Sequence, residues 1–219
     1  MTHQKHFEFN AFAENTYVIY NTNKEAAIID PGCSTVEECN HMADFIKAEG
    51  LKPVLLLNTH CHIDHILGNH FVYREYDLAP LLHRNELILL HSLSQVAAFY
   101  GVDAVPSPEP LRFIEEHEKI QLGDSVLEVI YCPGHSPGSV CFYNAEEKKL
   151  WGGDVLFRES IGRTDLPGGD YDTLEQNIRT KIFALPDEVE VFSGHGIPTT
   201  IGYEKVNNPF VGTISNHTR

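Results

Sequence analysis

The sequence predicts an α/β protein in which two mixed β-sheets pack face to face and helices cover both outer faces, an αββα sandwich. Three observations support this fold class. β-Rich segments occur in both halves of the chain, helical spacing of apolar residues recurs between them, and residues 53–58 (PVLLLN) contain an unbroken apolar run. A strand without polar alternation is typical of a sheet covered on both faces. Two such halves favour two packed sheets in one domain.

The first half begins with a predicted antiparallel meander, because its β-rich segments are separated by turn residues. A helix is predicted after Pro31-Gly32, where Ser34 and Glu37 have the spacing of a capping box and Gly50 is in the place of a C-cap. The predicted strands are 7–12, 15–20, 25–30 and 53–58, and the predicted helix is 35–49.

The second half repeats this alternation. Leu87, Leu90 and Leu93 recur at helical spacing, and the proline-rich segment 105–110 is a predicted surface loop. Asp172 and Glu175 have capping-box spacing at the start of a further helix. The predicted elements are a helix over 84–100, strands near 113–120, 125–131, 139–144, 149–153 and 188–194, and a helix from 172. We predict one domain over residues 1–219.

Charge and composition restrict the partners of the chain. Its 219 residues carry 31 acidic and 16 basic side chains, a formal charge of −15, which predicts no binding to nucleic acid or to an anionic membrane. No apolar run has the length of a signal peptide or a membrane span, so a cytoplasmic location is expected. The five cysteines are odd in number and form no C-x-x-C pair, which predicts reduced thiols. The expected partner is a small molecule.

Four metal-ligand side chains follow the predicted strand 53–58 within six residues. These are His60, His62, Asp64 and His65. In an extended chain His60 and His62 point to the same side, whereas a helix that begins near Ile63 turns the later two to another side. Two ligand pairs of this kind can serve two metal ions.

Three single residues complete the ligand set. His135, Asp154 and His195 each follow a predicted strand and stand beside a glycine. We expect them to meet the first four at the carboxyl ends of the strands. Imidazoles and carboxylates suit Zn²⁺, Fe²⁺ or Mn²⁺, and the absence of thiolates disfavours structural zinc. Asp154 is the natural bridge between two divalent ions, of which we favour zinc over iron or manganese.

The pattern H-x-H-x-D-H, followed by widely spaced His, Asp and His, resembles the metallo-β-lactamase superfamily over essentially the whole chain. The resemblance implies one ion on His60, His62 and His135 and another on Asp64, His65 and His195, with Asp154 between them. It also implies a structural role for Asp30 beneath the ligands. Asp154 is not a cysteine, which argues against the true β-lactamases, and His62 is not a glutamate, which argues against the flavodiiron branch.

Residues 153–157, 162–165 and 194–210 resemble the short glyoxalase II-like hydrolases. This resemblance implies a dinuclear hydrolase that cleaves thioesters such as S-D-lactoylglutathione by a metal-bridging hydroxide, with Asp64 orienting the hydroxide. Only about two dozen residues follow His195, so we expect no C-terminal glutathione-binding helical domain. Arg163 and Asp165 occupy the places of a glutathione-binding lysine and tyrosine. Arg163 is therefore a candidate substrate-binding residue, with a loop salt bridge as the alternative.

Other activities fit the same residues. The Gly162-Arg163-Thr164-Asp165 loop also resembles persulfide dioxygenases, which implies a single iron on His60, His135 and Asp154 and glutathione persulfide as substrate. A lactonase or phosphodiesterase would use the same dinuclear centre, because pocket loops rather than metal chemistry select the substrate. We favour hydrolysis because the segment after His195 is similar to the short glyoxalase II-like group. The oligomeric state is not predicted.

Overall fold

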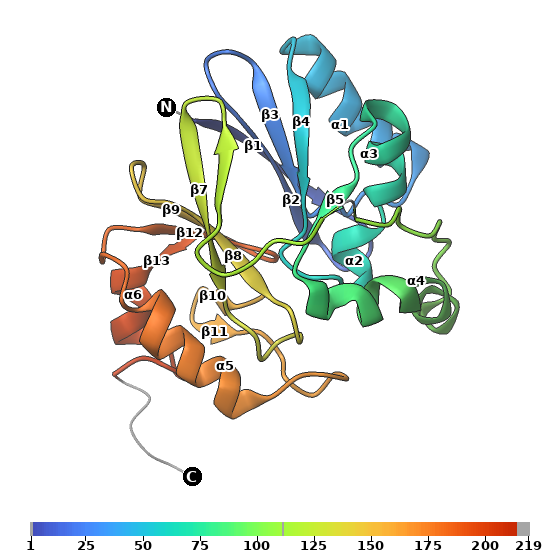
Figure 1. Ribbon diagram of the computed structural model, residues 1–219. Coiled ribbons are helices and arrows are strands. Elements are labelled where there is room, and N and C mark those ends of the chain that lie inside the picture. Colours follow the sequence, from blue (N-terminus) through green and yellow to red (C-terminus); the bar gives the residue numbers. More distant parts are fainter. Residues whose placement is uncertain (1, 111, 214–219) are drawn as a thin grey trace.

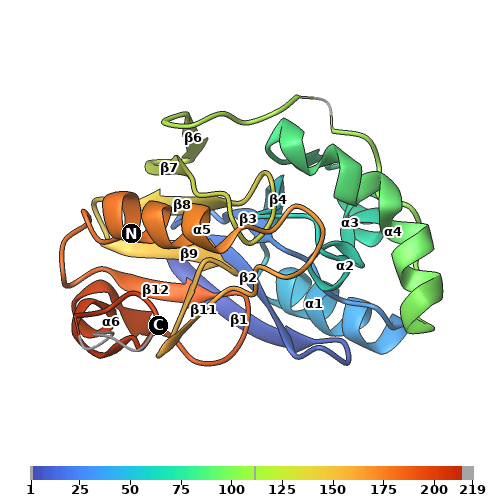
Figure 2. The same ribbon diagram turned by 90° about the horizontal axis from the view of Figure 1, so that it is seen from below.

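The computed structural model describes residues 2–110 and 112–213 and confirms the predicted fold class. Two sheets form the centre of the molecule, and helices lie on either side of them (Figure 1). In the perpendicular view of Figure 2, α5 and α6 gather at one side and α1 and α3 at the other. The order of layers is therefore helix, sheet, sheet, helix.

The first sheet is mixed. Strands β1, β2 and β3 pair antiparallel as the predicted meander, whereas β4 and β5 add in parallel to β3. The spatial order equals the sequence order. The strands are β1 His3–Phe9, β2 Glu14–Tyr20, β3 Glu25–Ile29, β4 Lys52–Leu57 and β5 Pro80–Leu81.

The second sheet is also mixed, in the order β13-β12-β9-β8-β7-β6. Strands β6 to β9 form an antiparallel series, β12 lies parallel to β9, and β13 is antiparallel to β12. A short hairpin, β10 and β11, stands apart. The strands are β6 Lys119–Leu122, β7 Ser125–Tyr131, β8 Val140–Asn144, β9 Lys149–Gly153, β10 Leu156–Phe157, β11 Ser160–Ile161, β12 Glu190–Ser193 and β13 Thr199–Thr200.

Helices cover the outer faces because each offers an apolar side to a sheet. Met42 and Ile46 of α1 pack on the first sheet, and Leu174 of α5 and Ile201 of α6 pack on the second. The helices are α1 Val36–Ala48, α2 Ile63–Ile66, α3 Asn69–Tyr76, the 3₁₀ turn η1 Arg84–Glu86, α4 Leu87–Tyr100, α5 Tyr171–Asn177, the π-helical turn η2 Ile178–Ile182 and α6 Ile201–Asn207.

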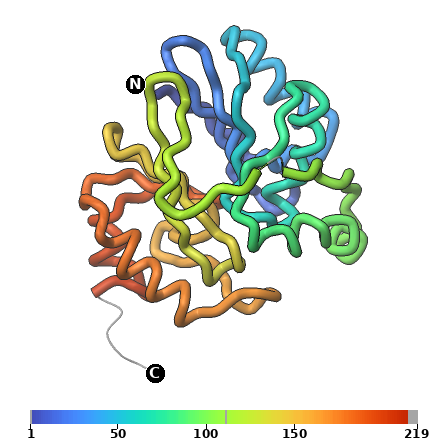
Figure 3. The backbone as a smooth tube through the Cα atoms, in the orientation of Figure 1, coloured from blue at the N-terminus to red at the C-terminus, as the bar shows by residue number. Residues whose placement is uncertain are grey.

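The main core lies between the two sheets. Alternate residues of β2 and β3, such as Ile19 and Ile29, meet Val129, Phe142 and Trp151 of the second sheet. Because side chains of a strand alternate between its faces, the residues between them serve the outer, helix-covered cores. The backbone tube shows the blue-to-green half of the chain on one side of this core and the yellow-to-red half on the other (Figure 3).

Neither predicted capping box is formed by the predicted residues. In α1 the box is formed by Thr35 and Glu38 instead of Ser34 and Glu37. The Glu38 carboxylate also accepts hydrogen bonds from the Ser34 hydroxyl and from the backbone N–H of Asn10, which favours this later register.

Helix α5 begins earlier than predicted. Asp170, rather than Asp172, accepts the hydrogen bond from the backbone N–H of Thr173. The N–H of Asp170 donates to the carbonyl of Gly134, which holds residue 170 in the extended backbone that an N-cap requires.

The strand predicted near 113–120 is shorter than expected, because β6 begins only at Lys119. His117 has a φ of 64°, a left-handed conformation that no strand contains. The Glu118 carboxylate accepts from the N–H of Glu115 and pairs with Arg112, which stabilises the turn before the strand.

Two further expectations concern the whole chain. All five cysteines are free thiols, as predicted. In the described part of the chain, no helix combines the length and the apolar character needed to cross a membrane.

Removal of a large side chain from the central core tests this packing. Phe142 is fully buried, so Phe142→Ala should lower the free energy of unfolding by about 3–5 kcal/mol through lost burial and a new cavity. Val126 of β7 is 38% exposed, and Val126→Ala should change it by less than about 0.5 kcal/mol. Urea denaturation of the two variants measures the difference, and equal effects would contradict the assigned core.

Candidate metal centre

The predicted ligands come from the carboxyl ends of strands in both sheets. The segment after β4 carries His60 and His62, and α2 begins at Ile63 as expected, which turns Asp64 and His65 to another side. His135 follows β7, Asp154 follows β9 and His195 follows β12. The structure brings all seven together at one edge of the sandwich.

Three imidazoles form the first cluster. Nδ1 of His62 lies 2.8 Å from Nε2 of His135, which in turn lies 3.2 Å from Nε2 of His60. All three ligand atoms lie within 4.8 Å of one another. Three nitrogen lone pairs that converge on one point are a typical arrangement for a transition metal. This is the group that the resemblance implies for one ion.

The second cluster contains Asp64, His65 and His195, whose ligand atoms also lie within 4.8 Å of one another. Nε2 of His195 is 3.1 Å from Oδ2 of Asp64, and Nε2 of His65 is 3.5 Å from the same oxygen. This is the group implied for the other ion.

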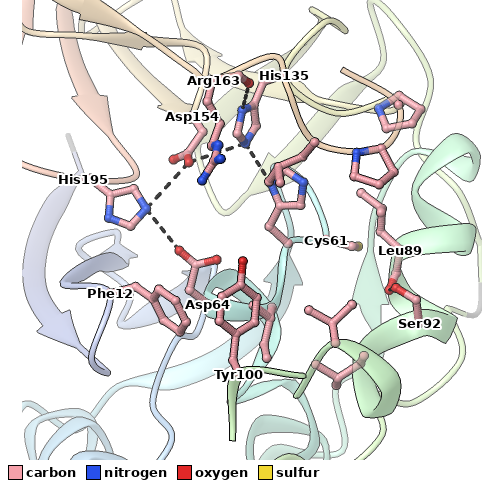
Figure 4. A pocket seen from close by; sticks show the side chains of 18 of the residues that line it. Phe12, Cys61, Asp64, Leu89, Ser92, Tyr100, His135, Asp154, Arg163 and His195 are labelled. Atoms are coloured by element: carbon pink, nitrogen blue, oxygen red, sulfur yellow. Dashed lines mark hydrogen bonds and ion pairs between the residues drawn. The ribbon is translucent and has the colours of Figure 1, made fainter. Parts of the chain in front are cut away.

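Asp154 lies between the clusters. Its Oδ2 is 3.5 Å from Nε2 of His135 and 3.6 Å from Nε2 of His195, and its Oδ1 is 3.4 Å from Nε2 of His65 (Figure 4). One carboxylate therefore faces nitrogens of both clusters, which is the position expected of a bridging ligand.

Protonation in the first cluster suits metal binding. Burial, and then the neighbouring His135, lower the pKa of His62 to about 3, and burial also lowers the pKa of His60 and of His135. These imidazoles are therefore neutral at pH 7, the form that binds a metal.

In the second cluster, burial lowers the pKa of His65, but the surrounding carboxylates raise it well above its usual range. Burial raises the pKa of Asp154, yet the nearby imidazoles hold it well below its usual range. Both carboxylates of the centre, Asp64 and Asp154, are consequently ionised.

Unsatisfied buried atoms test whether a metal fits. Nε2 of His65 and Oδ1 of Asp154 are fully buried and have no hydrogen-bond partner, although such atoms are costly to leave unpaired. Both point into the space between the clusters. A divalent cation would satisfy both atoms, so the residues present fit the metal.

The other ring nitrogens have partners that orient the imidazoles. Nδ1 of His135 donates to the carbonyl of Arg163 at 2.8 Å, and Nδ1 of His195 donates to the carbonyl of Ala13 at 3.1 Å. Such bonds fix the tautomer and leave Nε2 free to bind a metal. The ligand Nε2 atoms are thus preset by backbone from elsewhere in the fold.

Asp30 has the structural position that the resemblance implies. Its Oδ1 accepts from the N–H of Thr59 at 2.7 Å, and its Oδ2 accepts from the Thr59 hydroxyl and lies 3.2 Å from Nδ1 of His65. Asp30 also lies within 4.8 Å of ligand atoms of His60 and His65, but its oxygens are engaged by Thr59 and by Nδ1 of His65, which suits a supporting role.

The sequence prediction missed two buried glutamates. Glu86 accepts from the N–H of Cys61, the hydroxyl of Ser136 and the N–H of Gly138, and so joins the two loops that carry His60, His62 and His135. Glu14 lies 3.8 Å from Nδ1 of His65, and burial raises its pKa well above the usual range. Neither residue stands in a motif, and no local pattern identifies either.

Close backbone packing explains the glycine beside His195. A Cβ at Gly194 would stand 2.2 Å from Oδ1 of Asp154 and 2.6 Å from Cε1 of His65, distances that no side chain tolerates. The residue before His195 must therefore be a glycine for Asp154 and His65 to keep these positions.

Arg163 forms the loop salt bridge that was the alternative to substrate binding. Its guanidinium makes a two-point pair with Asp165, with Nε at 2.7 Å and Nη2 at 2.8 Å from the carboxylate oxygens. Arg163 also lines the pocket over the metal centre. A role in substrate binding stays a prediction.

An αββα sandwich with paired His/Asp clusters at one sheet edge is an arrangement typical of metallohydrolases. The sequence profile described as "Metallo-beta-lactamase superfamily" matches residues 10–195. The chain belongs to the metallo-β-lactamase superfamily, as the ligand pattern indicated.

Similar proteins agree with this family. Hydroxyacylglutathione hydrolase GloC of Haemophilus influenzae is 38% identical over 94% of this chain and 96% of its own length. The structure of BLEG-1 B3 metallo-beta-lactamase has a TM-score of 0.87 at 37% identity, covering 95% of this chain and 99% of its own. TTHA1623 in a di-iron-bound form has a TM-score of 0.85 at 34% identity, covering 94% and 99%.

Loss of the central carboxylate tests the two-ion arrangement. We expect about two divalent ions per wild-type chain and one or none in Asp154→Ala, because the variant lacks the oxygens shared by both clusters. Elemental analysis against protein concentration measures this, and the exposed Asp44→Ala is the matched control. Equal metal content in wild type and Asp154→Ala would contradict the arrangement.

Glu86 tests the support of the ligand loops. Glu86→Ala leaves three buried donors without an acceptor and should lower the free energy of unfolding by about 3–5 kcal/mol. Zinc affinity, measured by competition with a chromophoric chelator, should fall about 10- to 100-fold, as is usual when support of metal ligands is lost. Glu86→Gln keeps one acceptor oxygen, so its zinc affinity should lie between those of the wild type and Glu86→Ala. Unchanged affinity in both variants would exclude this role.

Proposed function

We propose that this protein is a dinuclear metal-dependent hydrolase of thioesters and related esters. The observation that carries the proposal is the position of Asp154, which faces both histidine clusters at the floor of an open pocket. We propose His60, His62 and His135 as one ligand group and Asp64, His65 and His195 as the other. When bound, two divalent ions lower the pKa of water and polarise a carbonyl group. Zinc is the favoured ion, with iron or manganese as alternatives.

The side chains of the chain would hold the nucleophilic water and the substrate carbonyl in place. Asp64 faces the pocket, and the nearby imidazoles lower its pKa despite burial, so its carboxylate is ionised and accepts a hydrogen bond from water. Nε2 of His195 lies 3.1 Å from this carboxylate, so the two groups face the same part of the pocket. Asp64 thereby aims a water lone pair at the carbonyl carbon.

Hydrolysis then needs no side-chain nucleophile. The oxygen of water adds to the carbonyl carbon, the C–S bond breaks, and the products are a carboxylate and a thiol. A thiolate is a weakly basic leaving group, so it needs little help from a general acid. Cys61 is buried in the core around α2 and α4, and burial raises the pKa of its thiol, so a cysteine nucleophile is not needed or favoured.

Similarity supports this substrate class. The relative named hydroxyacylglutathione hydrolase GloC aligns with nearly the whole chain, and S-D-lactoylglutathione is therefore the first thioester to test. The neighbour described in a di-iron-bound form supports a two-ion centre. We further propose that the chain acts as one domain in the cytoplasm on a small molecule, without nucleic acid or membrane.

β-Lactam hydrolysis is a second candidate, because one neighbour at 37% identity is described as a B3 metallo-β-lactamase. Addition of water to a β-lactam carbonyl would use the same centre. The persulfide dioxygenase alternative requires one iron and oxygen consumption, which separates it from both hydrolytic reactions.

Asp64→Asn tests the mechanism. We expect kcat/KM for S-D-lactoylglutathione or for S-acetyl-N-acetylcysteamine to fall about 10²- to 10⁴-fold, because the amide no longer orients the water. Thiol release measured with a chromogenic disulfide reports the rate, and Asp44→Asn on the outer face of α1 is the control. Metal content is measured in the same samples to separate lost orientation from lost metal.

The outcome can overturn the proposal. If the wild-type protein binds two metal ions but cleaves no thioester, ester or lactone, the proposed hydrolase activity is excluded. Ring opening of a β-lactam alone would favour the second candidate. One iron per chain with oxygen consumption on glutathione persulfide would replace hydrolysis by dioxygenation.

A further inference from the structure

The metal centre lies at the floor of a pocket of about 1260 Å³, larger than a small acyl group such as lactoyl requires. The side chains around the mouth come from distant segments. They include Phe12 before β2, helix α4, the segment 157–168 and Ile197 after the last ligand. Figure 4 shows Phe12, Leu89, Ser92 and Tyr100 around the space opposite His135 and Asp154.

Helix α4 forms an apolar wall of this pocket. Its sequence, LILLHSLSQVAAFY, is apolar on two faces. Leu90, Leu93 and Ala97 are buried in the core shared with α2. A second, largely apolar stripe at helical spacing lines the pocket, and its members are Ile88, Leu89, Ser92, Gln95, Val96, Phe99 and Tyr100.

This second stripe is costly to leave in water. Ile88 is 71% exposed and Phe99 is 83% exposed, and Ile197 across the mouth is 63% exposed. The ring of Tyr100 contacts that of Phe12 edge-on, with centroids 5.5 Å apart, which extends the apolar surface toward the metal centre. Exposed apolar surface that is continuous with a pocket marks a binding surface.

The cations of the pocket are poorly suited to a polyanionic substrate. Among the described lining residues other than histidine, Arg158 and Arg163 carry positive charge. Asp165 binds one edge of the Arg163 guanidinium through Nε and Nη2, and the Arg158 guanidinium lies 4.4 Å from the centre of the Tyr203 ring. Both cations are thus already engaged within the protein, in a chain of net charge −15, so the pocket is built less for the two carboxylates of a glutathione group than for apolar groups.

We propose that the apolar wall of α4 binds an aliphatic or aromatic acyl group, so that the substrates are thioesters or esters of apolar carboxylic acids. This inference rests on the proposed hydrolase. The thiol or alcohol part of the substrate is assigned to the opposite rim, which carries the polar side chains of Arg158 and Ser160. The acyl group is then left to Ile88, Val96 and Phe99 on α4.

Binding and turnover test this inference separately. Zinc-loaded wild-type protein is titrated by calorimetry with two non-hydrolysable thioethers, S-ethyl- and S-octyl-N-acetylcysteamine. Burial of each methylene strengthens binding by up to about fourfold, so we expect S-octyl to bind at least about tenfold more tightly. In parallel, kcat/KM is measured for the acetyl, hexanoyl and octanoyl thioesters and should rise by about tenfold or more along the series.

A double variant places the effect on α4. Ile88→Gln/Phe99→Gln should remove most of the gain in kcat/KM from the acetyl to the octanoyl thioester, and the loss should appear as a higher KM for the octanoyl thioester. The control is Val36→Gln/Val206→Gln, which removes two exposed apolar side chains of α1 and α6, and it should keep the full gain. All four substituted side chains are exposed, and the metal content of both variants is measured to check that the centre is intact.

The outcomes distinguish the two proposals. Selective S-octyl binding by a protein that hydrolyses no thioester supports the apolar pocket and overturns the proposed hydrolase. Thioester hydrolysis with no dependence on chain length, or with a lower KM for S-D-lactoylglutathione than for octanoyl, overturns the apolar specificity. If the double variant loses kcat/KM equally for the acetyl and the octanoyl thioester, the proposed role of α4 in acyl binding is overturned.

Discussion

The metal centre depends on buried carboxylates that are not predicted to be ligands. Glu86 holds the loop after β4 against the loop after β7, and Asp30 holds Thr59 and His65 at the end of β3. These buried carboxylates accept several hydrogen bonds, and an unmet buried donor is costly. Without these carboxylates, no buried side chain in the described part of the chain would hold the loop of His60 and His62 at a fixed distance from the loop of His135.

Burial of several carboxylates together has an electrostatic consequence. Glu14, Asp30, Asp64 and Asp154 are all buried around His65. Mutual repulsion and lost hydration destabilise such a group unless positive charge lies among it. The pKa values of His65 and Glu14 are both raised, so bound protons reduce the negative charge of this group. Divalent cations between the clusters would supply the missing charge without protonating the ligands.

The sequence predicted which candidate ligands lie together better than it predicted the residues that support them. The grouping of His60 with His62 could be predicted from local sequence. It depends on the alternation of side chains along an extended segment and on the start of α2, and both are set by neighbouring residues. Glu86 acts on partners 25, 50 and 52 positions away, and no local pattern encodes such contacts. The capping boxes failed for the same reason. Thr35 and Asp170 were selected over their neighbours by bonds to residues 10 and 134, which only the folded chain brings close.

The two halves of the chain contribute different properties to one pocket. The first half provides α4, whose inner stripe packs on α2 beside the ligands while its other stripe faces the cavity. The second half provides His135, Asp154 and His195 and the rim with Arg158. Asn15 and Tyr17 of β2 donate to the carbonyl of Ser193, so the last ligand loop is fastened to the first sheet. A substrate bound at the centre would therefore contact both halves of the chain.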